Sequence, residues 1–174
     1  MIVLSFNERD AEHELYIQHV IEKIKSHNCI VQQTGIEKKL PKDFITTLLE
    51  LVKDPTASFL RFQPDISGVK NRETAFLCEV KSRITNSPNI SMELEPFEKV
   101  LDLRTIGIRV FYVLPEFKVA FPEQIKIDEI HVPDRWSEEI FLDVKVRYSK
   151  TEVKYVKRST YGSGTIYFLS LIHI

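Results

Sequence analysis

The stretch at residues 64–83, PDISGVKNRETAFLCEVKSR, decides the fold of this chain. It opens with a proline and a carboxylate, and it closes on an apolar run that carries Glu79 and Lys81 one residue apart. Because side chains alternate between the two faces of a strand, Glu79 and Lys81 share one face, while Cys78 and Val80 share the other and face the core. The run "AFLCEV" is apolar on both faces, which is typical of an interior strand. An acid and a base in such a strand call for a chemical explanation.

Asp65 supplies part of that explanation. It stands at the end of the strand that precedes residues 74–82 in the expected hairpin, and we expect its carboxylate to lie near Glu79. Two carboxylates suit Mg²⁺, which binds hard oxygen ligands together with phosphate and water. The backbone carbonyl of Val80 is a further candidate ligand. A bound metal polarises a phosphoryl oxygen and lowers the pKa of its water, and the ammonium of Lys81 can orient that water.

The surrounding pattern predicts an α/β (α+β) fold. Helices are expected at about residues 9–27, 41–53 and 96–105, from apolar side chains at helical spacing. The expected strands are residues 29–33, 58–69, 74–82, 108–114, 125–132, 140–149 and 164–169. A helix between the strands at 74–82 and 108–114 suggests a parallel crossover. Together, these elements predict a mixed central sheet flanked by helices, with extra strands near the C-terminus.

The arrangement resembles the PD-(D/E)XK nuclease superfamily. The matching residues are Pro64-Asp65, then thirteen residues, then Glu79-Val80-Lys81, and the order of elements agrees from about residue 9 to 113. The resemblance implies a restriction-endonuclease-like fold and Mg²⁺-dependent hydrolysis of DNA, with Mn²⁺ as an alternative metal. Asp65, Glu79 and Val80 would hold the metal, and Lys81 would position the attacking water. The helix at 41–53 departs from the compact resolvases of the family.

Many members of that family add a glutamate from the first helix to the metal site. The string "AEHEL" resembles the corresponding "ExEL" and favours Glu12. Helix register favours Glu14 instead, because Ile17 and Ile21 follow it at i+3 and i+7. We expect Glu14 at the catalytic metal site and keep Glu12 as the second candidate.

Basic and aromatic side chains alternate near the C-terminus. Residues 141–174 carry six basic against two acidic side chains, although the net charge of the chain is −1. This run predicts contacts to nucleic-acid phosphates, and a solvated strand face is the competing interpretation. The residues expected to bind nucleic acid are Arg83, Lys145, Arg147, Lys154, Lys157 and Arg158. DNA is the expected partner, RNA is an open alternative, and a homodimer would suit a double-strand cut.

Length and composition predict one domain at residues 1–168, with a core at about 9–132 and a strand-rich extension at 138–168. Two cysteines make no disulfide framework, and no apolar run approaches the roughly 18–20 residues of a membrane span, so a cytoplasmic protein is expected. The last six residues, LSLIHI, can be encoded by CTGTCTCTTATACACATC, the mosaic end of a transposon used in sequencing libraries. We therefore expect residues 169–174 to be a non-native tail.

Two other functions compete with an endonuclease. One is a catalytically inactive nuclease-fold module that binds nucleic acid or protein. The other is a structural α/β domain in which Glu79 and Lys81 form a solvated pair. The histidine spacing matches no HxxxH zinc motif, and the chain has no GxSxG or Walker motif, so these patterns support neither a zinc enzyme, a serine hydrolase nor a P-loop NTPase.

Overall fold

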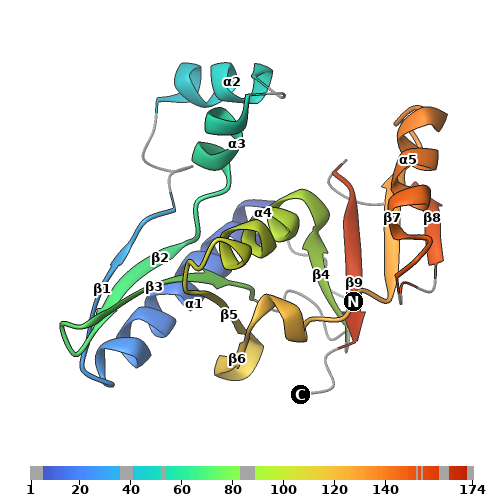
Figure 1. The fold of residues 1–174 in the computed structure, drawn as a ribbon. Coiled ribbons are helices and arrows are strands. Elements are labelled where there is room, and N and C mark those ends of the chain that lie inside the picture. The colour runs from blue at the N-terminus through green and yellow to red at the C-terminus, as the bar shows by residue number, and fades with distance from the viewer. Residues whose placement is uncertain are drawn as a thin grey trace. The chain divides into compact units, whose positions relative to one another are not determined.

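The computed structural model describes residues 6–35, 41–51, 54–82, 89–151, 153, 155–160 and 165–171 (Figure 1). Contacts divide the chain into two compact units. The first consists of Met1–Ile84 and Asp102–Phe121, and the second of Thr85–Leu101 and Pro122–Ile174. Within the described ranges, no helix combines the length and the apolar character that crossing a membrane requires.

The first unit contains a five-stranded mixed sheet. Its elements are α1 (Phe6–Lys25), β1 (Cys29–Gln33), α2 (Lys42–Glu50), α3 (Pro55–Arg61), β2 (Ile66–Lys70), β3 (Thr74–Val80), β5 (Val110–Leu114) and β6 (Lys118–Ala120). The strand order is β1-β2-β3-β5-β6. Strands β3 and β5 are parallel, as the predicted crossover requires, and the other neighbours are antiparallel.

Strands β2 and β3 form the hairpin predicted around the polar KNRE connection. Asn71 and Arg72 have positive φ values of 53° and 60°, which is the backbone twist that tight hairpin connections favour. Gly68 lies opposite Phe76 in this hairpin. A Cβ at Gly68 would come within 2.3 Å of the Phe76 ring, so close packing on this face requires glycine.

Helix α1 covers one face of the sheet. Its buried Ile17, Val20 and Ile21 pack against Cys78 and Val80 of β3. Burial of one aliphatic side chain contributes about 1.5–3 kcal/mol, so this contact fixes which face of β3 turns inward. The predicted alternation is confirmed: the residues on either side of Glu79 point toward α1, and Glu79 points to the opposite face.

The second unit contains a four-stranded sheet in the order β4-β9-β7-β8. Its elements are β4 (Asn89–Glu93), β7 (Glu129–Pro133), α5 (Glu138–Tyr148), β8 (Tyr155–Ser159), β9 (Tyr167–Leu171) and the first part of α4 (Leu94–Thr105). Phe97 of α4 packs edge-on against Phe168 of β9, with ring centroids 4.8 Å apart. The mixed α/β class is confirmed, and the hairpin–helix–parallel strand order is consistent with a restriction-endonuclease-like fold.

Two strand predictions were wrong. Residues 140–149 belong mainly to helix α5, because the Ser137 hydroxyl caps it by accepting the Ile140 N–H at 3.3 Å. The N-terminal part of the strand expected at 58–69 is helix α3, where Asp54 accepts the Ala57 N–H at 2.7 Å. The "DPT" sequence therefore starts a new helix after α2 has ended at Glu50.

The C-terminal residues 169–171 continue strand β9 beyond the strand end expected at residue 169. Leu169 pairs with Ser91 of β4 and with Glu129 of β7. Residues 172–174 lie outside the described part of the chain. A non-native origin of residues 169–174 stays a prediction.

Candidate active site

Asp65 and Glu79 are brought together by the register of the β2–β3 hairpin. Ile66 stands opposite Cys78, so the next step of the antiparallel register places Asp65 opposite Glu79. Opposite residues of neighbouring strands point to the same face. Since Ile66 and Cys78 face α1, both carboxylates project from the other side of the sheet.

The backbone and side chain of Asp65 are both anchored. Its Oδ2 accepts the backbone N–H of Val80 at 2.7 Å. Its carbonyl oxygen accepts the N–H of Thr34 at 2.8 Å and that of Gly35 at 3.2 Å. These bonds connect the residues after β1 with β3, and they fix the carboxylate at the start of β2.

Pro64 cannot donate a backbone hydrogen bond to the carbonyl of Val80. The N–H groups of Leu77 and Lys81 donate to carbonyls of Arg109 and Val113 on the β5 side, so the backbone of Val80, between them in the alternation, faces β2. The residue opposite Val80 in the extended register is Pro64, which has no N–H to donate. The proline therefore leaves the Val80 carbonyl without this ladder partner, as a metal ligand would require.

Lys81 lies against Glu79. Its Nζ donates to Oε1 of Glu79 at 2.7 Å, and the two side chains are 27% and 15% exposed. Its backbone N–H donates to Val113 of β5 at 2.9 Å. The ammonium is thus held beside the Glu79 carboxylate at the carboxyl end of β3.

Tyr112 is a neighbour that the sequence interpretation missed. It pairs with Glu79 in the parallel β3–β5 register and is only 1% exposed. Burial raises the pKa of its hydroxyl above the usual value, and the charges of Glu79 and Asp65 raise it further. The predicted pairing of β3 with β5 could have identified Tyr112, because residues that pair in neighbouring parallel strands point to the same face of the sheet.

The two candidate glutamates of α1 lie in different surroundings. Glu14 accepts hydrogen bonds from Gln33 Nε2 at 3.0 Å and 3.2 Å and from Gln18 at 3.3 Å. Gln33 stands opposite Ile66 on the α1 face, whereas Glu79 points to the other face. Glu12 is exposed and lines a pocket together with Ser82, the residue after Lys81. The assignment of Glu14 to the metal stays a prediction.

The donor set suits a divalent cation held in part by water. Among the residues that the structure describes, no three His, Cys, Asp or Glu side chains form a group that could hold a metal by themselves. Asp65, Glu79 and the Val80 carbonyl provide two carboxylates and one neutral oxygen. Mg²⁺ commonly uses one or two carboxylates with several waters, so these residues fit Mg²⁺.

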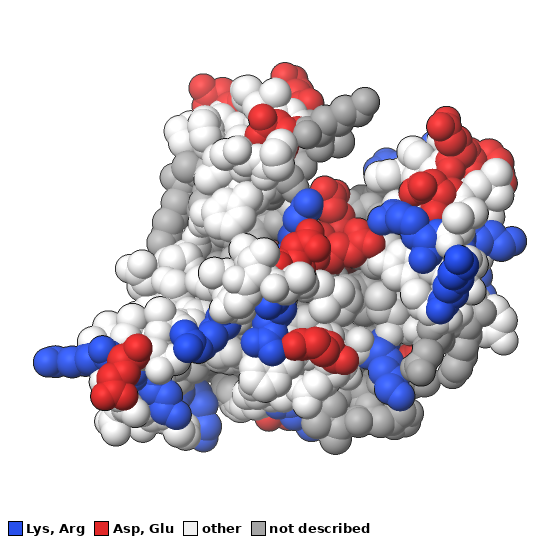
Figure 2. All heavy atoms as spheres, viewed as in Figure 1, with Lys and Arg blue, Asp and Glu red and all other residues white. Residues whose placement is uncertain are grey.

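The structure describes four of the six basic residues expected to bind nucleic acid, and three of these four bond to acids. Within the second unit, Arg147 bonds to Glu98 and Asp143, each at 3.1 Å. Lys157 bonds to Glu129 at 3.0 Å, and this bond is the main reason why the pKa of Glu129 is lowered. Figure 2 shows Asp and Glu side chains next to Lys and Arg side chains in this view.

Arg158 has a structural role in the second unit. Its guanidinium donates to the carbonyl of Trp136 and to Glu138, each at 2.7 Å, and lies over the Phe141 ring. It thereby ties β8 to α5 and to the turn before it. Lys145 is exposed on α5, while Arg83 and Lys154 lie outside the described residues. Nucleic-acid binding by these six residues stays a prediction.

No protein family model and no curated protein matches the sequence. Among solved structures, the chain is similar to the 1.6 Å structure of a Holliday junction resolvase from Archaeoglobus fulgidus, an archaeal hyperthermophile. The TM-score is 0.42 at 13% sequence identity, and the match covers 64% of this chain and 76% of that chain.

Proposed function

We propose that this protein is a metal-dependent nuclease that hydrolyses phosphodiester bonds in DNA. The observation that carries the proposal is the pair of contacts at the end of β3, where Lys81 bonds to Glu79 at 2.7 Å and Asp65 accepts the Val80 N–H at 2.7 Å. Two carboxylates and one ammonium thus gather at the end of an otherwise apolar strand. They suit a site where a metal and a negatively charged phosphate meet.

Each residue has a distinct role in the proposed reaction. Asp65, Glu79 and the Val80 carbonyl would hold Mg²⁺ or Mn²⁺, which when bound supplies a water of lowered pKa and polarises the phosphoryl oxygen. The Lys81 ammonium orients the attacking water and offsets negative charge that develops on the phosphate. The Asp65–Val80 bond keeps one carboxylate fixed, so little reorganisation accompanies the reaction. The proposal does not depend on a third carboxylate from α1, because Glu14 bonds to Gln33 on the opposite face of the sheet from Glu79.

A cleavage assay tests the proposal. Wild type, Asp65→Asn and Lys81→Ala would be incubated with supercoiled plasmid, linear duplex and single-stranded DNA, each with Mg²⁺, Mn²⁺ or EDTA. We expect metal-dependent cutting that both substitutions abolish. Conversion of closed circular plasmid would establish endonuclease action, and an RNA substrate would test the DNA preference. Cutting that survives in Asp65→Asn would contradict the assignment.

One observation favours a second candidate, a nuclease-fold module that binds nucleic acid without cutting it. The described residues contain no group of three metal-binding side chains. Such a module would bind DNA with a strong dependence on salt and would show no metal-dependent cutting. The same assay, combined with a binding measurement in EDTA, separates the two candidates.

A further inference from the structure

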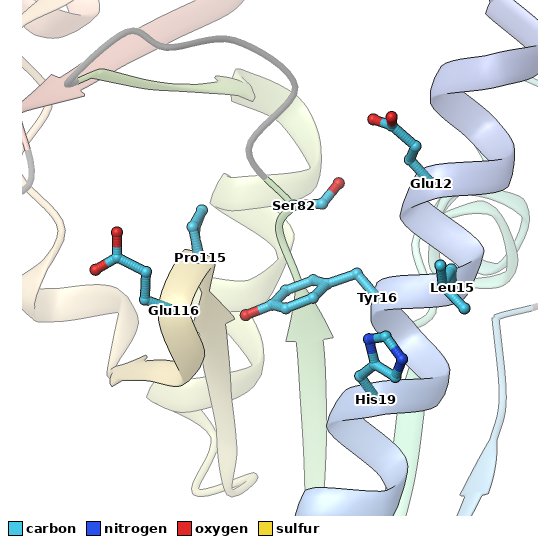
Figure 3. Close-up of a pocket in the computed structure, with 7 residues that line it drawn as sticks. All are labelled: Glu12, Leu15, Tyr16, His19, Ser82, Pro115 and Glu116. Carbon is cyan, nitrogen blue, oxygen red and sulfur yellow. The ribbon is translucent and has the colours of Figure 1, made fainter.

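A pocket of about 310 Å³ lies within the first unit, on the α1 side of the end of β3 (Figure 3). Figure 3 shows the Tyr16 ring reaching from α1 toward the Pro115–Glu116 loop. The side chains that matter for its chemistry are Glu12, Leu15, Tyr16, His19, Ser82 and Glu116. The pocket therefore opens where the parallel strands β3 and β5 end, and ligands of open α/β sheets bind at such carboxyl ends.

One wall of this pocket has a strained backbone. Glu116 and Phe117 have φ values of 63° and 57°, in the left-handed region that non-glycine residues rarely adopt. The Tyr16 hydroxyl holds the loop by donating to the Leu114 carbonyl at 2.6 Å and accepting the Phe117 N–H at 3.1 Å. Residues in this region cost about 1–3 kcal/mol each and cluster at functional sites. The strained backbone of this wall is therefore a second observation, beside the pocket itself, that indicates a functional site.

Consecutive residues of the chain belong to the candidate active site and to the pocket. Ser82 lines the pocket, and the preceding Lys81 bonds to Glu79 on the other side of the strand. His13 Nδ1 and the Ser82 hydroxyl lie 3.0 Å apart, which fixes Ser82 against α1. The two sites therefore lie at neighbouring residues at the carboxyl end of β3.

The lining chemistry selects a neutral, planar ligand that donates hydrogen bonds. Tyr16 and His19 supply rings for stacking, and Leu15 supplies an apolar edge. Glu12 and Glu116 supply carboxylates, which accept N–H groups and disfavour a phosphate at the same place. Ligand pockets begin at about 300 Å³, so this one has room for a single small group.

We propose that this pocket binds one unpaired nucleobase of the strand whose phosphate is cut at the Asp65–Glu79–Lys81 site. The proposal rests on the nuclease function above and names the substrate class: DNA with at least one unstacked nucleotide. Removing a base from the stack costs least where it is already mismatched or unpaired. The pocket therefore directs the enzyme to bulges, loops and single strands in preference to perfect duplex.

Binding in EDTA tests this inference separately from cleavage. The probes are two fluorescent duplexes that differ at one bulged position, which carries either an adenine or an abasic sugar. Both keep the same phosphates, so the ratio of their dissociation constants reports the base alone. We expect the adenine bulge to bind about 5- to 10-fold more tightly, the low end for one base–aromatic stack.

A double variant, Leu15→Ala with His19→Ala, should bring that ratio close to one. The matched control is Leu142→Ala with His27→Ala, which changes two exposed side chains outside the pocket and should preserve the ratio. Both pocket residues are exposed, so the double variant should fold.

The outcomes separate the two proposals. Equal affinity of wild type for both probes, with metal-dependent cutting intact, would overturn the pocket and leave the nuclease standing. An adenine preference with no cutting under any metal would support the pocket and count against the nuclease. Failure to bind either probe and to cut any substrate would overturn both.

Discussion

The carboxylate of Asp65 accepts the backbone N–H of Val80 at 2.7 Å, opposite a proline that cannot donate in return. A side chain thus takes the place of a backbone acceptor at the end of the β2–β3 ladder. Asp65 therefore has a structural and a proposed catalytic role, and substitutions must separate the two.

Asp65→Asn should separate them. The amide oxygen can still accept the Val80 N–H, so the melting temperature should stay near that of wild type. The lost negative charge should lower cleavage by at least about 100-fold, as expected when one preorganised electrostatic group is removed. Plasmid cleavage and thermal unfolding of the same preparation check both expectations.

Asp65→Ala, in contrast, should lower both activity and stability. An unsatisfied N–H at Val80 costs about 1–3 kcal/mol of unfolding free energy. If Asp65→Asn lost as much stability as Asp65→Ala, its low activity would report misfolding, and the catalytic interpretation would lose its support.

Lys81→Ala should abolish cleavage while DNA binding in EDTA changes little. The ammonium acts mainly on the developing charge of the reaction, so its removal affects turnover more than affinity. Lys118→Ala is a matched control, because Lys118 also pairs with a glutamate two residues earlier, Glu116, at 3.5 Å. Equal activity of the two alanine variants would show that Lys81 has no special role.

The sequence predicted the part of the fold in which hydrophobic periodicity and motif agree. Helix α1, the β2–β3 hairpin and the parallel β5 follow from apolar spacing that one buried face enforces, with Ile17 and Cys78 as examples. The faces of Glu79 and Lys81 follow from the same alternation. Their neighbour Tyr112 required the register between two strands distant in sequence.

Short segments whose apolar residues fit both the period of a helix and that of a strand were predicted wrongly. The run "FLDVKV" alternates apolar and polar residues like a strand, yet only Val144 is buried in α5. The Ser137 cap, Glu138 in the first turn and Arg147 in the last turn decide for the helix. The interpretation gave weight to the alternation and overlooked these end signals. Strand β6 has three residues and carries no local pattern at all.

Gly68→Ala should destabilise the first unit strongly. The new Cβ would lie 2.3 Å from the Phe76 ring and 2.7 Å from Val31, and overpacking of a core costs about 1–3 kcal/mol. Gly35→Ala is the matched control, because its Cβ would meet Asp65 at an ordinary 3.5 Å. Urea unfolding should show a clear loss for the first variant and a small change for the second.

A compensating change tests the cause of that loss. Phe76→Leu removes the ring that the new methyl group strikes, so the double variant Gly68→Ala with Phe76→Leu should be less destabilised than the sum of the single changes predicts. Simple additivity would place the cause elsewhere in the hairpin.

Tyr16→Phe should weaken the strained loop after β5. The hydroxyl bridges the Leu114 carbonyl and the Phe117 N–H, and loss of both bonds should cost about 1–3 kcal/mol. Amide hydrogen exchange at Glu116 and Phe117 should accelerate more than in the core of β3. Unchanged protection of the loop would show that the hydroxyl does not hold it.

Glu129→Gln should give a pH-dependent loss of stability in the second unit. The bond from Lys157 is the main cause of the lowered pKa of Glu129, with a smaller contribution from His131. A carboxyl whose folded pKa is lowered stabilises the fold above its unfolded pKa, and this contribution disappears as the pH falls through the folded value. Because Glu129 is partly exposed, the effect near pH 7 should stay below about 1 kcal/mol.

Urea unfolding from pH 7 to pH 3 should show the difference between wild type and Glu129→Gln shrinking toward acid. In a Lys157→Met background the substitution should lose most of its pH dependence, and a dependence that persisted there would assign the shift to a group other than Lys157.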